Sequence, residues 1–269
     1  MLKKVLGDYD LPSFPSTVMK SLQRIRHPES SAASIAEVLS VDPGLSVRVL
    51  SMANSAAFSP TKRVENLAQA VALIGLSQLE SLILAIGVSR AIPPNPAPGY
   101  DMKQFWKASA RRGVLAHRIS SITSPTRKPE CFTAGFLQDM AMPFLVKQHP
   151  EQYLEILASW HSDNVDLCKL EREAFGWDHA EVATWICQEW DLPESIASAI
   201  GAHHGANLDI YQDLPPVSIV AFLDNEANEW CLDAMVESAH SQHGIQPSHM
   251  HELIELSFEA AEDLARLID

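Results

Sequence analysis

The chain has 269 residues, 46% of them hydrophobic and 20% charged, which is enough to bury one large or two modest hydrophobic cores. With 11 glycines and 4 cysteines, the composition excludes a disordered chain, a collagen-like repeat and a disulfide-stabilised scaffold. The net charge of −14 is unevenly divided: residues 1–129 carry 16 Lys and Arg against 8 Asp and Glu, and residues 130–269 carry 4 against 26. The acidic half repels phosphate polymers and anionic membranes, so any nucleic-acid surface belongs to the first half.

The start of the chain predicts neither a secretory signal nor a membrane anchor. Two lysines are followed by Asp8 and Asp10 before any long apolar run begins. The most apolar stretch, residues 67–88, is interrupted by two glutamines and Glu80, which argues for core helices and against a membrane span. The four cysteines show no C-x-x-C spacing and are expected to be reduced, buried thiols. We therefore expect a cytoplasmic protein.

Apolar residues recur with a helical period along nearly the whole chain, and no segment with turns on both sides alternates with the period of a strand. The predicted fold class is therefore all-α. Gly75 is expected to end one helix and Ser77 to cap the next. Helices are predicted at residues 16–26, 34–40, 43–53, 67–74, 77–91, 103–121, 132–146, 151–160, 167–175, 179–190, 194–203 and 216–230, with a closing amphipathic helix near 253–267.

A proline-rich segment at residues 92–99 divides this pattern. Proline lacks a backbone donor and restricts the residue before it, so the segment cannot be helical. It predicts a boundary between an N-terminal helical subdomain, residues 1–92, and a second one, residues 100–269. The closing helix is expected to pack on the second subdomain, with a dimer seam as the alternative.

The richest candidate site is a dispersed set of histidines and aspartates in the second half: Asp139, His179, His203, His204 and Asp224. Both aspartates fall in segments expected to be apolar helices, where an unpaired carboxylate costs free energy. One explanation is a hard divalent cation held by imidazoles and carboxylates. The other is a polar network in which these side chains satisfy one another, and the wide spacing along the chain favours this second explanation.

The basic residues concentrate in one segment. Residues 100–129 carry 7 Lys and Arg against 1 Asp, whereas residues 1–99 carry 9 against 7 acidic residues. Arg111, Arg112 and Arg118 are therefore the candidates for contacting an acidic partner, with a merely solvated face as the alternative. This basic seam is available for docking within the molecule or with another protein.

Several motifs in the chain resemble the HDOD family. They are D-P-G-L at residues 42–45 followed by A-N-S-A-A-F at 53–58, A-G-F-L-Q-D at 134–139, W-D-H-A-E-V-A at 177–183 and the His203-His204 pair. The resemblance covers about residues 10–225. It implies an all-helical module of bacterial signalling proteins, in which an HD-like bundle follows a packed N-terminal helical subdomain.

The HDOD family is in turn a degenerate relative of the HD superfamily of metal-dependent phosphohydrolases. Active members of that superfamily bind metal through a His on one helix, a His-Asp pair on the next and a later Asp. Here the first His position falls at or near Ser109, the pair reads Gln138-Asp139, and Met142 stands where a lysine usually follows. The loss of two imidazoles and one positive charge removes much of what a hydrolytic site requires.

These observations predict a non-catalytic bacterial signalling or scaffold module that acts through protein–protein interaction. We assign no catalytic residue, expect no cofactor, and expect signalling proteins as partners, with a homodimer left open. One alternative is a metal-dependent phosphohydrolase of the HD superfamily that uses a divalent metal at the His and Asp set. A second is a nucleic-acid-binding regulator acting through the basic half, which the absence of a basic recognition helix disfavours.

Overall fold

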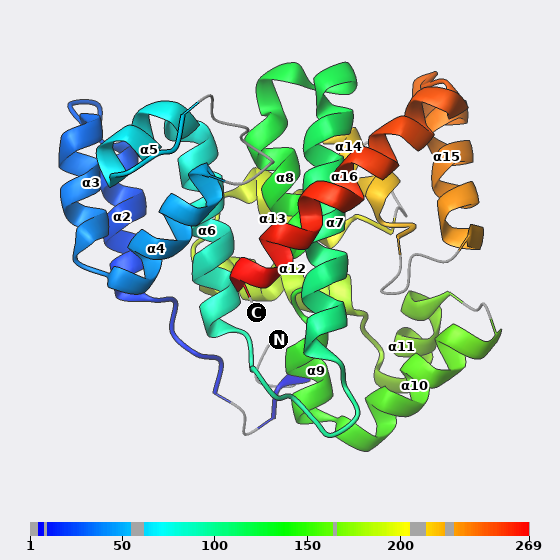
Figure 1. Cartoon of the computed structure of the whole chain (residues 1–269). Coiled ribbons are helices and arrows are strands. Elements are labelled where there is room, and N and C mark those ends of the chain that lie inside the picture. The colour runs from blue at the N-terminus through cyan, green and yellow to red at the C-terminus, as the bar shows by residue number, and fades with distance from the viewer. Residues whose placement is uncertain are drawn as a thin grey trace.

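The computed structural model describes residues 5–7, 10–54, 62–163, 166–204, 214–223 and 229–268. All regular secondary structure in these ranges is helical, which confirms the all-α prediction (Figure 1). The N-terminal group comprises α2 (Ser16–Arg26), α3 (Ala32–Ser40), α4 (Pro43–Ala53), α5 (Leu67–Ile74) and α6 (Leu76–Ala91). The second group comprises α7 (Met102–Thr123), the 3-10 turn η1 (Pro125–Arg127), α8 (Lys128–Leu137), α9 (Met142–Gln148), α10 (Pro150–Asp163), α11 (Leu167–Phe175), α12 (His179–Glu189), α13 (Glu194–Gly201), α14 (Pro215–Val220), α15 (Glu229–His243) and α16 (Pro247–Ile268).

Local capping explains where the N-terminal helices begin. The Asp42 side chain accepts a hydrogen bond from the Leu45 N–H at 2.9 Å, with Pro43 in the first turn of α4. Ser31 forms a capping box with Ser34, so α3 begins two residues earlier than predicted. The prediction that Ser77 caps α6 is wrong. Gly75 adopts a φ of 78°, which reverses the chain in one residue, so α6 begins at Leu76.

α7 is the central element of the second group and packs most extensively against α8 and α16. The close approach of α7 and α8 depends on glycine. A Cβ at Gly135 would lie 2.9 Å from the Ala116 Cβ and 3.1 Å from the Arg112 carbonyl oxygen. This contact brings Arg112 of α7 beside the turn that follows α8.

The predicted helix at residues 132–146 is two helices, α8 and α9, separated by a turn at residues 138–141. Pro143 has no N–H to bond the Asp139 carbonyl, as a continuous helix would require. The Met142 N–H instead bonds the Asp139 carbonyl oxygen at 3.0 Å. Asp139 therefore lies in a turn between helices and not inside a helix. The predicted helix at 216–230 is also interrupted, since α14 ends at Val220.

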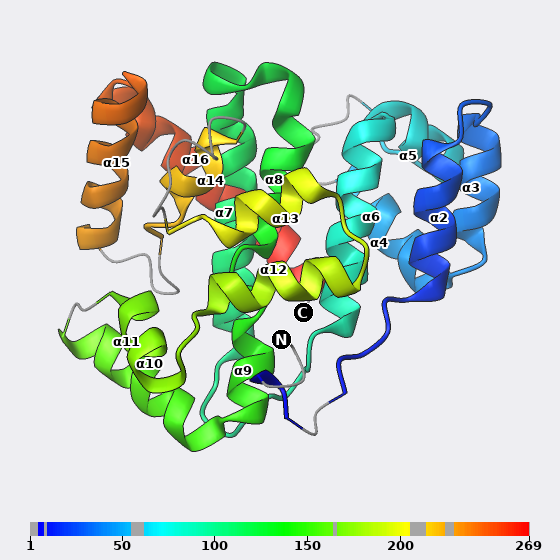
Figure 2. The same cartoon turned by 180° about the vertical axis from the view of Figure 1, so that it is seen from behind.

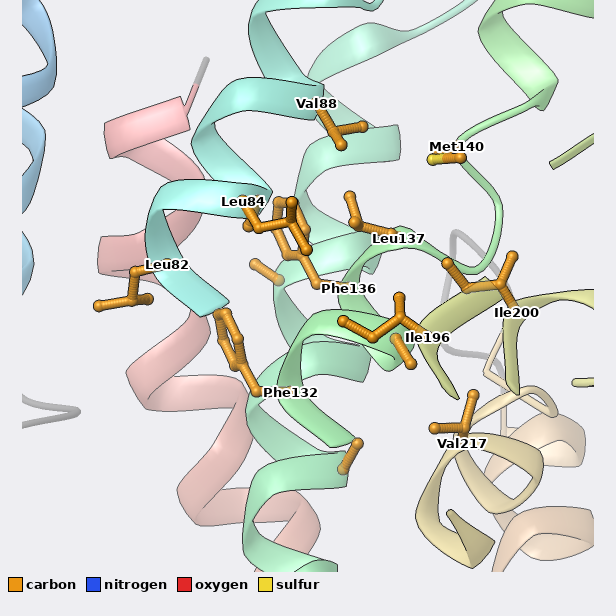
Figure 3. Close-up of a cluster of buried hydrophobic side chains, with 14 of the residues drawn as sticks. Leu82, Leu84, Val88, Phe132, Phe136, Leu137, Met140, Ile196, Ile200 and Val217 are labelled. Atoms are coloured by element: carbon orange, nitrogen blue, oxygen red, sulfur yellow. The ribbon is translucent and has the colours of Figure 1, made fainter. Parts of the chain in front are cut away.

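One hydrophobic core runs through both groups of helices. α6 packs on α2 and on α8. Figure 3 shows Leu84 and Val88 of α6 facing the same buried region as Phe136 of α8, with Ile196 of α13 and Val217 of α14 further along it. The division into residues 1–92 and 100–269 stays a prediction, because a shared core neither requires nor excludes it.

No single helix in the described ranges is both long and apolar enough to cross a membrane. α5 and α6 reach the required length and apolar character only when they are taken together, and they are bent by 112° relative to each other. All four cysteines are free and buried, as predicted.

Candidate metal centre

Four of the five predicted His and Asp residues meet at one point. Asp139 comes from the turn between α8 and α9, His179 opens α12, and His203 and His204 follow α13. One ligand atom from each of the four lies within 4.8 Å of the others. The fifth candidate, Asp224, lies outside the described residues. A second group, Cys168 with Glu171 and His179, shares a member with the first.

The His179 backbone is placed by its own sequence context. Asp178 caps α12 by accepting the Glu181 N–H at 2.8 Å, and the Glu181 side chain accepts the Asp178 N–H at 3.1 Å. This capping box fixes His179 as the first residue of the helix, as the sequence predicted. Its side chain is fully buried.

The distances between the four potential ligand atoms are close to those in a coordination shell. The Nε2 atom of His179 lies 3.2 Å from His203 Nε2, 3.0 Å from His204 Nε2 and 3.6 Å from Asp139 Oδ1. His203 Nε2 lies 3.2 Å from the same Asp139 oxygen. Ligands on a tetrahedral metal with bonds of about 2.0–2.2 Å are separated by about 3.3–3.6 Å. Three of the four distances fall just below this range and the fourth reaches its upper end, so the four atoms lie slightly closer together than the ligands of such an ion.

The hydrogen bonds of the histidine rings indicate that hydrogen-bond acceptors converge on the centre. His179 Nδ1 lies 2.7 Å from Glu171 Oε2, and His203 Nδ1 lies 2.6 Å from the Ile200 carbonyl oxygen. Both Nδ1 atoms face acceptors and must carry protons, so in the neutral rings both Nε2 lone pairs face the centre. The Asp139 carboxylate adds a further acceptor. Such a cluster requires positive charge from added protons or from a metal ion.

Glu171 and Tyr153 form the layer behind His179. Glu171 Oε2 also accepts the His179 backbone N–H at 3.0 Å, and the Tyr153 hydroxyl donates to Glu171 Oε1. Burial disfavours the charged imidazole, but the carboxylates of Glu171 and Asp139 outweigh it and raise the pKa of His179 to about 10. A carboxylate that accepts from a histidine Nδ1 orients the ring and makes Nε2 a better ligand. This pair was not predicted from the sequence, although the glutamate eight residues before His179 was a usable signal.

Arg112 supplies the positive charge opposite Asp139. Its Nη1 lies 2.6 Å from Asp139 Oδ2, and its Nε donates to the Leu223 carbonyl oxygen at 2.8 Å. Burial raises the pKa of Asp139, but Arg112, His179 and His203 outweigh it and hold that pKa well below 3.8. The prediction that Arg112 contacts a partner is wrong, because its side chain is only 2% exposed. A surface position was predicted for Arg112 because it lies among other basic residues on the same helix.

Three other residues of the basic seam, Lys107, Arg111 and Arg118, contact α16. The guanidinium carbon of Arg111 lies 4.4 Å from the centroid of the Phe258 ring, and Glu262 lies 2.7 Å from the Lys107 Nζ. Arg118 donates to the Leu256 carbonyl oxygen at 3.5 Å. These contacts place Arg111 and Arg118 in an intramolecular interface, while a role for them toward a partner stays a prediction.

The positions that depart from the HD pattern are buried. Ser109 and Gln138 are each 1% exposed, and neither the Ser109 hydroxyl nor the Gln138 amide has a hydrogen-bond partner among the described residues. His204 is the exposed member of the cluster, and the other three are buried. Three imidazoles with one carboxylate favour a borderline ion such as Zn²⁺ or Fe²⁺ over Mg²⁺. The expectation of a hard cation therefore does not suit the donor set.

Comparison with known proteins identifies relatives by sequence and by fold. An uncharacterized protein of Treponema pallidum (strain Nichols) is 25% identical over 214 residues, which cover 79% of this chain and 41% of that protein, so the chain spans less than half of its relative. The crystal structure of a "Putative phosphohydrolase" from Shewanella amazonensis SB2B superimposes with a TM-score of 0.76 at 21% identity, covering 98% of this chain and 97% of that one.

A "Putative signal transduction protein" from Marinobacter aquaeolei VT8 gives a TM-score of 0.73 at 19% identity, over 99% of this chain and 61% of that one. At such identities, the two structural matches show a shared fold. The HDOD domain family model matches residues 11–206, most of the chain. The chain belongs to the HDOD family.

Proposed function

We propose that the chain is a non-catalytic signalling module that acts through protein–protein contacts and binds one divalent transition-metal ion in its HD-type centre. The observation that supports the metal is the convergence of four potential ligand atoms, one each from Asp139, His179, His203 and His204, which all lie within 4.8 Å of one another. In the neutral rings of His179 and His203, whose Nδ1 protons point outward, both Nε2 atoms are acceptors, and a cation would satisfy them together with Asp139 Oδ1.

These four side chains would hold the ion, which when bound supplies the two positive charges that the acceptors need. Glu171 orients His179 through Nδ1. Arg112 holds Asp139 through Oδ2, which leaves Oδ1 directed at the three imidazoles. The protein thus fixes both the direction and the charge of its own ligands.

The same geometry supports a binding site without hydrolysis. Asp139, His179, His203 and His204 would give the ion four protein ligands, the number found in structural zinc sites, whereas catalytic zinc sites have three and keep a position open for water. The Arg112 guanidinium is committed to Asp139 and Leu223 and is not presented to a phosphate. Met142, where catalytic relatives carry a lysine, is 1% exposed and uncharged. The signalling role itself is supported by family membership and by the name of the Marinobacter relative.

The test measures metal content, stability and turnover on one preparation. Chelator-treated protein is titrated with Zn²⁺, Fe²⁺, Mn²⁺ and Mg²⁺ under anaerobic conditions, and the melting temperature and bound metal are recorded. Hydrolysis of bis(p-nitrophenyl) phosphate and of nucleotides is assayed with each ion. His204→Ala removes the exposed ligand, and His251→Ala, an exposed histidine of α16, serves as the control.

We expect one equivalent of Zn²⁺ or Fe²⁺, a raised melting temperature and no turnover, with weaker binding in His204→Ala and unchanged binding in His251→Ala. Absence of stoichiometric binding for all four ions would overturn the metal site. Turnover that disappears in Asp139→Ala would overturn the non-catalytic assignment and establish the phosphohydrolase alternative.

A further inference from the structure

A cavity of about 500 Å³ lies between α2 and the end of α3, away from the metal centre. Figure 2 shows α2 and α3 at the edge of the molecule, whereas α12 and α13 lie near its middle. The volume falls within the range of about 300–1,000 Å³ that small-molecule sites occupy. No residue of the metal centre lines this cavity.

One wall of the cavity carries positive charge. Lys20 and Arg24 line it from successive turns of α2 and His27 from the position directly after α2, and none of its lining residues is acidic. His27 Nδ1 accepts the Glu29 N–H at 3.2 Å, so the proton of the neutral ring is on Nε2 and can be donated elsewhere. The wall thus offers an ammonium, a guanidinium and an imidazole N–H. These are the donor types that bind phosphate oxygens.

The charges on this wall lack counter-ions within the described part of the chain. No described carboxylate forms an ion pair with Lys20 or Arg24, although the chain as a whole carries a net charge of −14. Arg26, which does not line the cavity, shows the contrast, because it pairs with Glu80 at 2.6 Å. Like charges four residues apart on a helix repel one another. A bound anion would relieve that repulsion.

The opposite wall is apolar and open to solvent. Val38 and Val41 line it, and Val41, at 74%, is the most exposed of the large hydrophobic residues within the described ranges. The α2 side is held in place by Thr17, whose hydroxyl donates to Asp42 Oδ2 at 3.1 Å. A ligand that fits both walls carries an anionic head and an apolar body.

We infer that the α2–α3 cavity binds a small organic phosphate, with the phosphate against Lys20, Arg24 and His27 and an apolar ring against Val38 and Val41. The arrangement uses a guanidinium fork and an ammonium for the anion, as phosphate sites commonly do. The site is independent of the metal centre, since no residue belongs to both.

The test uses the full chain and named probes. Binding of AMP, phenyl phosphate and inorganic phosphate is measured by titration calorimetry and by ligand-observed NMR. Lys20→Gln and Arg24→Gln each remove one charge from the cavity wall, and Val41→Ser removes the apolar contact. Arg26→Gln removes the same charge from the same helix outside the cavity and is the matched control, with circular dichroism checking that each variant is folded.

We expect AMP or phenyl phosphate to bind more tightly than inorganic phosphate, because inorganic phosphate has no apolar body. Arg24→Gln should weaken binding about tenfold or more, the usual effect of losing a hydrogen bond to a charged group. Val41→Ser should weaken the binding of the organic probes and leave the binding of inorganic phosphate unchanged. Binding of AMP without binding of phenyl phosphate would identify a nucleotide site. Binding of phenyl phosphate without binding of AMP would identify a simple aryl phosphate site.

No binding of any probe at millimolar concentration would overturn the inference. Equal losses in Arg24→Gln and the folded Arg26→Gln control would also overturn it, since they would indicate a general charge effect.

Discussion

At the scale of single residues, Arg112 decides the character of the buried centre. Asp139 is buried, and Arg112 is the permanent cation that faces it from within the fold. Its guanidinium ties α7 to the turn after α8 and to the Leu223 carbonyl. A buried ion pair adds little net stability by itself, but breaking it leaves an uncompensated charge.

Arg112→Met is therefore expected to lower the free energy of unfolding by about 3–5 kcal/mol. Urea unfolding followed by circular dichroism measures the change. Arg266→Met is the control, because the Arg266 side chain is 74% exposed and its pair with Asp263 contributes under about 1 kcal/mol. If both variants lost the same small amount, the Arg112–Asp139 pair would have no structural role.

Glu171 is a positioning residue for His179. Glu171→Gln keeps the shape of the side chain and removes its charge, so we expect metal affinity to fall by about 10- to 100-fold, the usual effect of losing a carboxylate behind a ligating histidine. Competition with a chromophoric chelator measures the affinity. Glu173→Gln, on the same helix with a side chain 65% exposed, should leave it unchanged. Unaltered affinity in Glu171→Gln would contradict the role assigned to this carboxylate.

At the scale of elements, the start of α4 joins several helices through one carboxylate. Asp42 caps α4, receives the Arg90 guanidinium of α6 through both oxygens, and accepts from Thr17 of α2. Chiefly through Arg90, these contacts hold the pKa of Asp42 well below its ordinary value of 3.8, although partial burial opposes them. One side chain thus connects α2, α4 and α6.

The lowered pKa of Asp42 predicts a defined pH dependence. Its stabilising contribution is complete above the unfolded-state pKa of 3.8 and is lost as the pH falls toward the lower folded-state pKa. The difference in unfolding free energy between the parent chain and Asp42→Asn should therefore be constant from neutral pH to about pH 5. Below pH 3.8 it should shrink by at most about 1.4 kcal/mol per pH unit. Urea unfolding at several pH values measures it, and a constant difference down to pH 2.5 would contradict the prediction.

At the scale of the whole molecule, α6 and Trp190 connect the N-terminal helices to the second group. The Trp190 indole N–H donates to the Pro12 carbonyl oxygen at 3.0 Å. The centroid of the Trp190 ring lies 5.6 Å from the centroid of the Phe14 ring and 6.1 Å from that of the Phe144 ring. α6 packs on both α2 and α8 within a single hydrophobic core. The two parts of the chain therefore share their stabilising contacts.

We expect the chain to unfold in one cooperative transition, because neither group of helices can lose α6 without exposing its core. Tryptophan fluorescence and far-ultraviolet circular dichroism should give coincident urea curves, with equal midpoints and slopes. Trp190→Phe should lower the midpoint and keep a single transition. Two separated transitions would indicate that residues 1–92 and 100–269 unfold independently.

The sequence by itself determined the helical class and many helix boundaries. α2, α4 and α11 begin and end at the predicted residues, because apolar period, caps and terminators act over a few neighbours. Local chemistry also placed His179 at the start of its helix. The His and Asp candidates came from residue type and from the family resemblance, which does not depend on knowing the packing.

Only the tertiary structure decided what those candidates do together. Asp139, His179 and His203 are separated by 24 to 64 positions in the chain, and their meeting depends on how α8, α12 and α13 pack. Arg112 was predicted to be a surface cation and is a buried counter-ion, because its burial also depends on how the helices pack. Burial and pairing are properties of contacts between distant segments, whereas helix formation is a property of near neighbours.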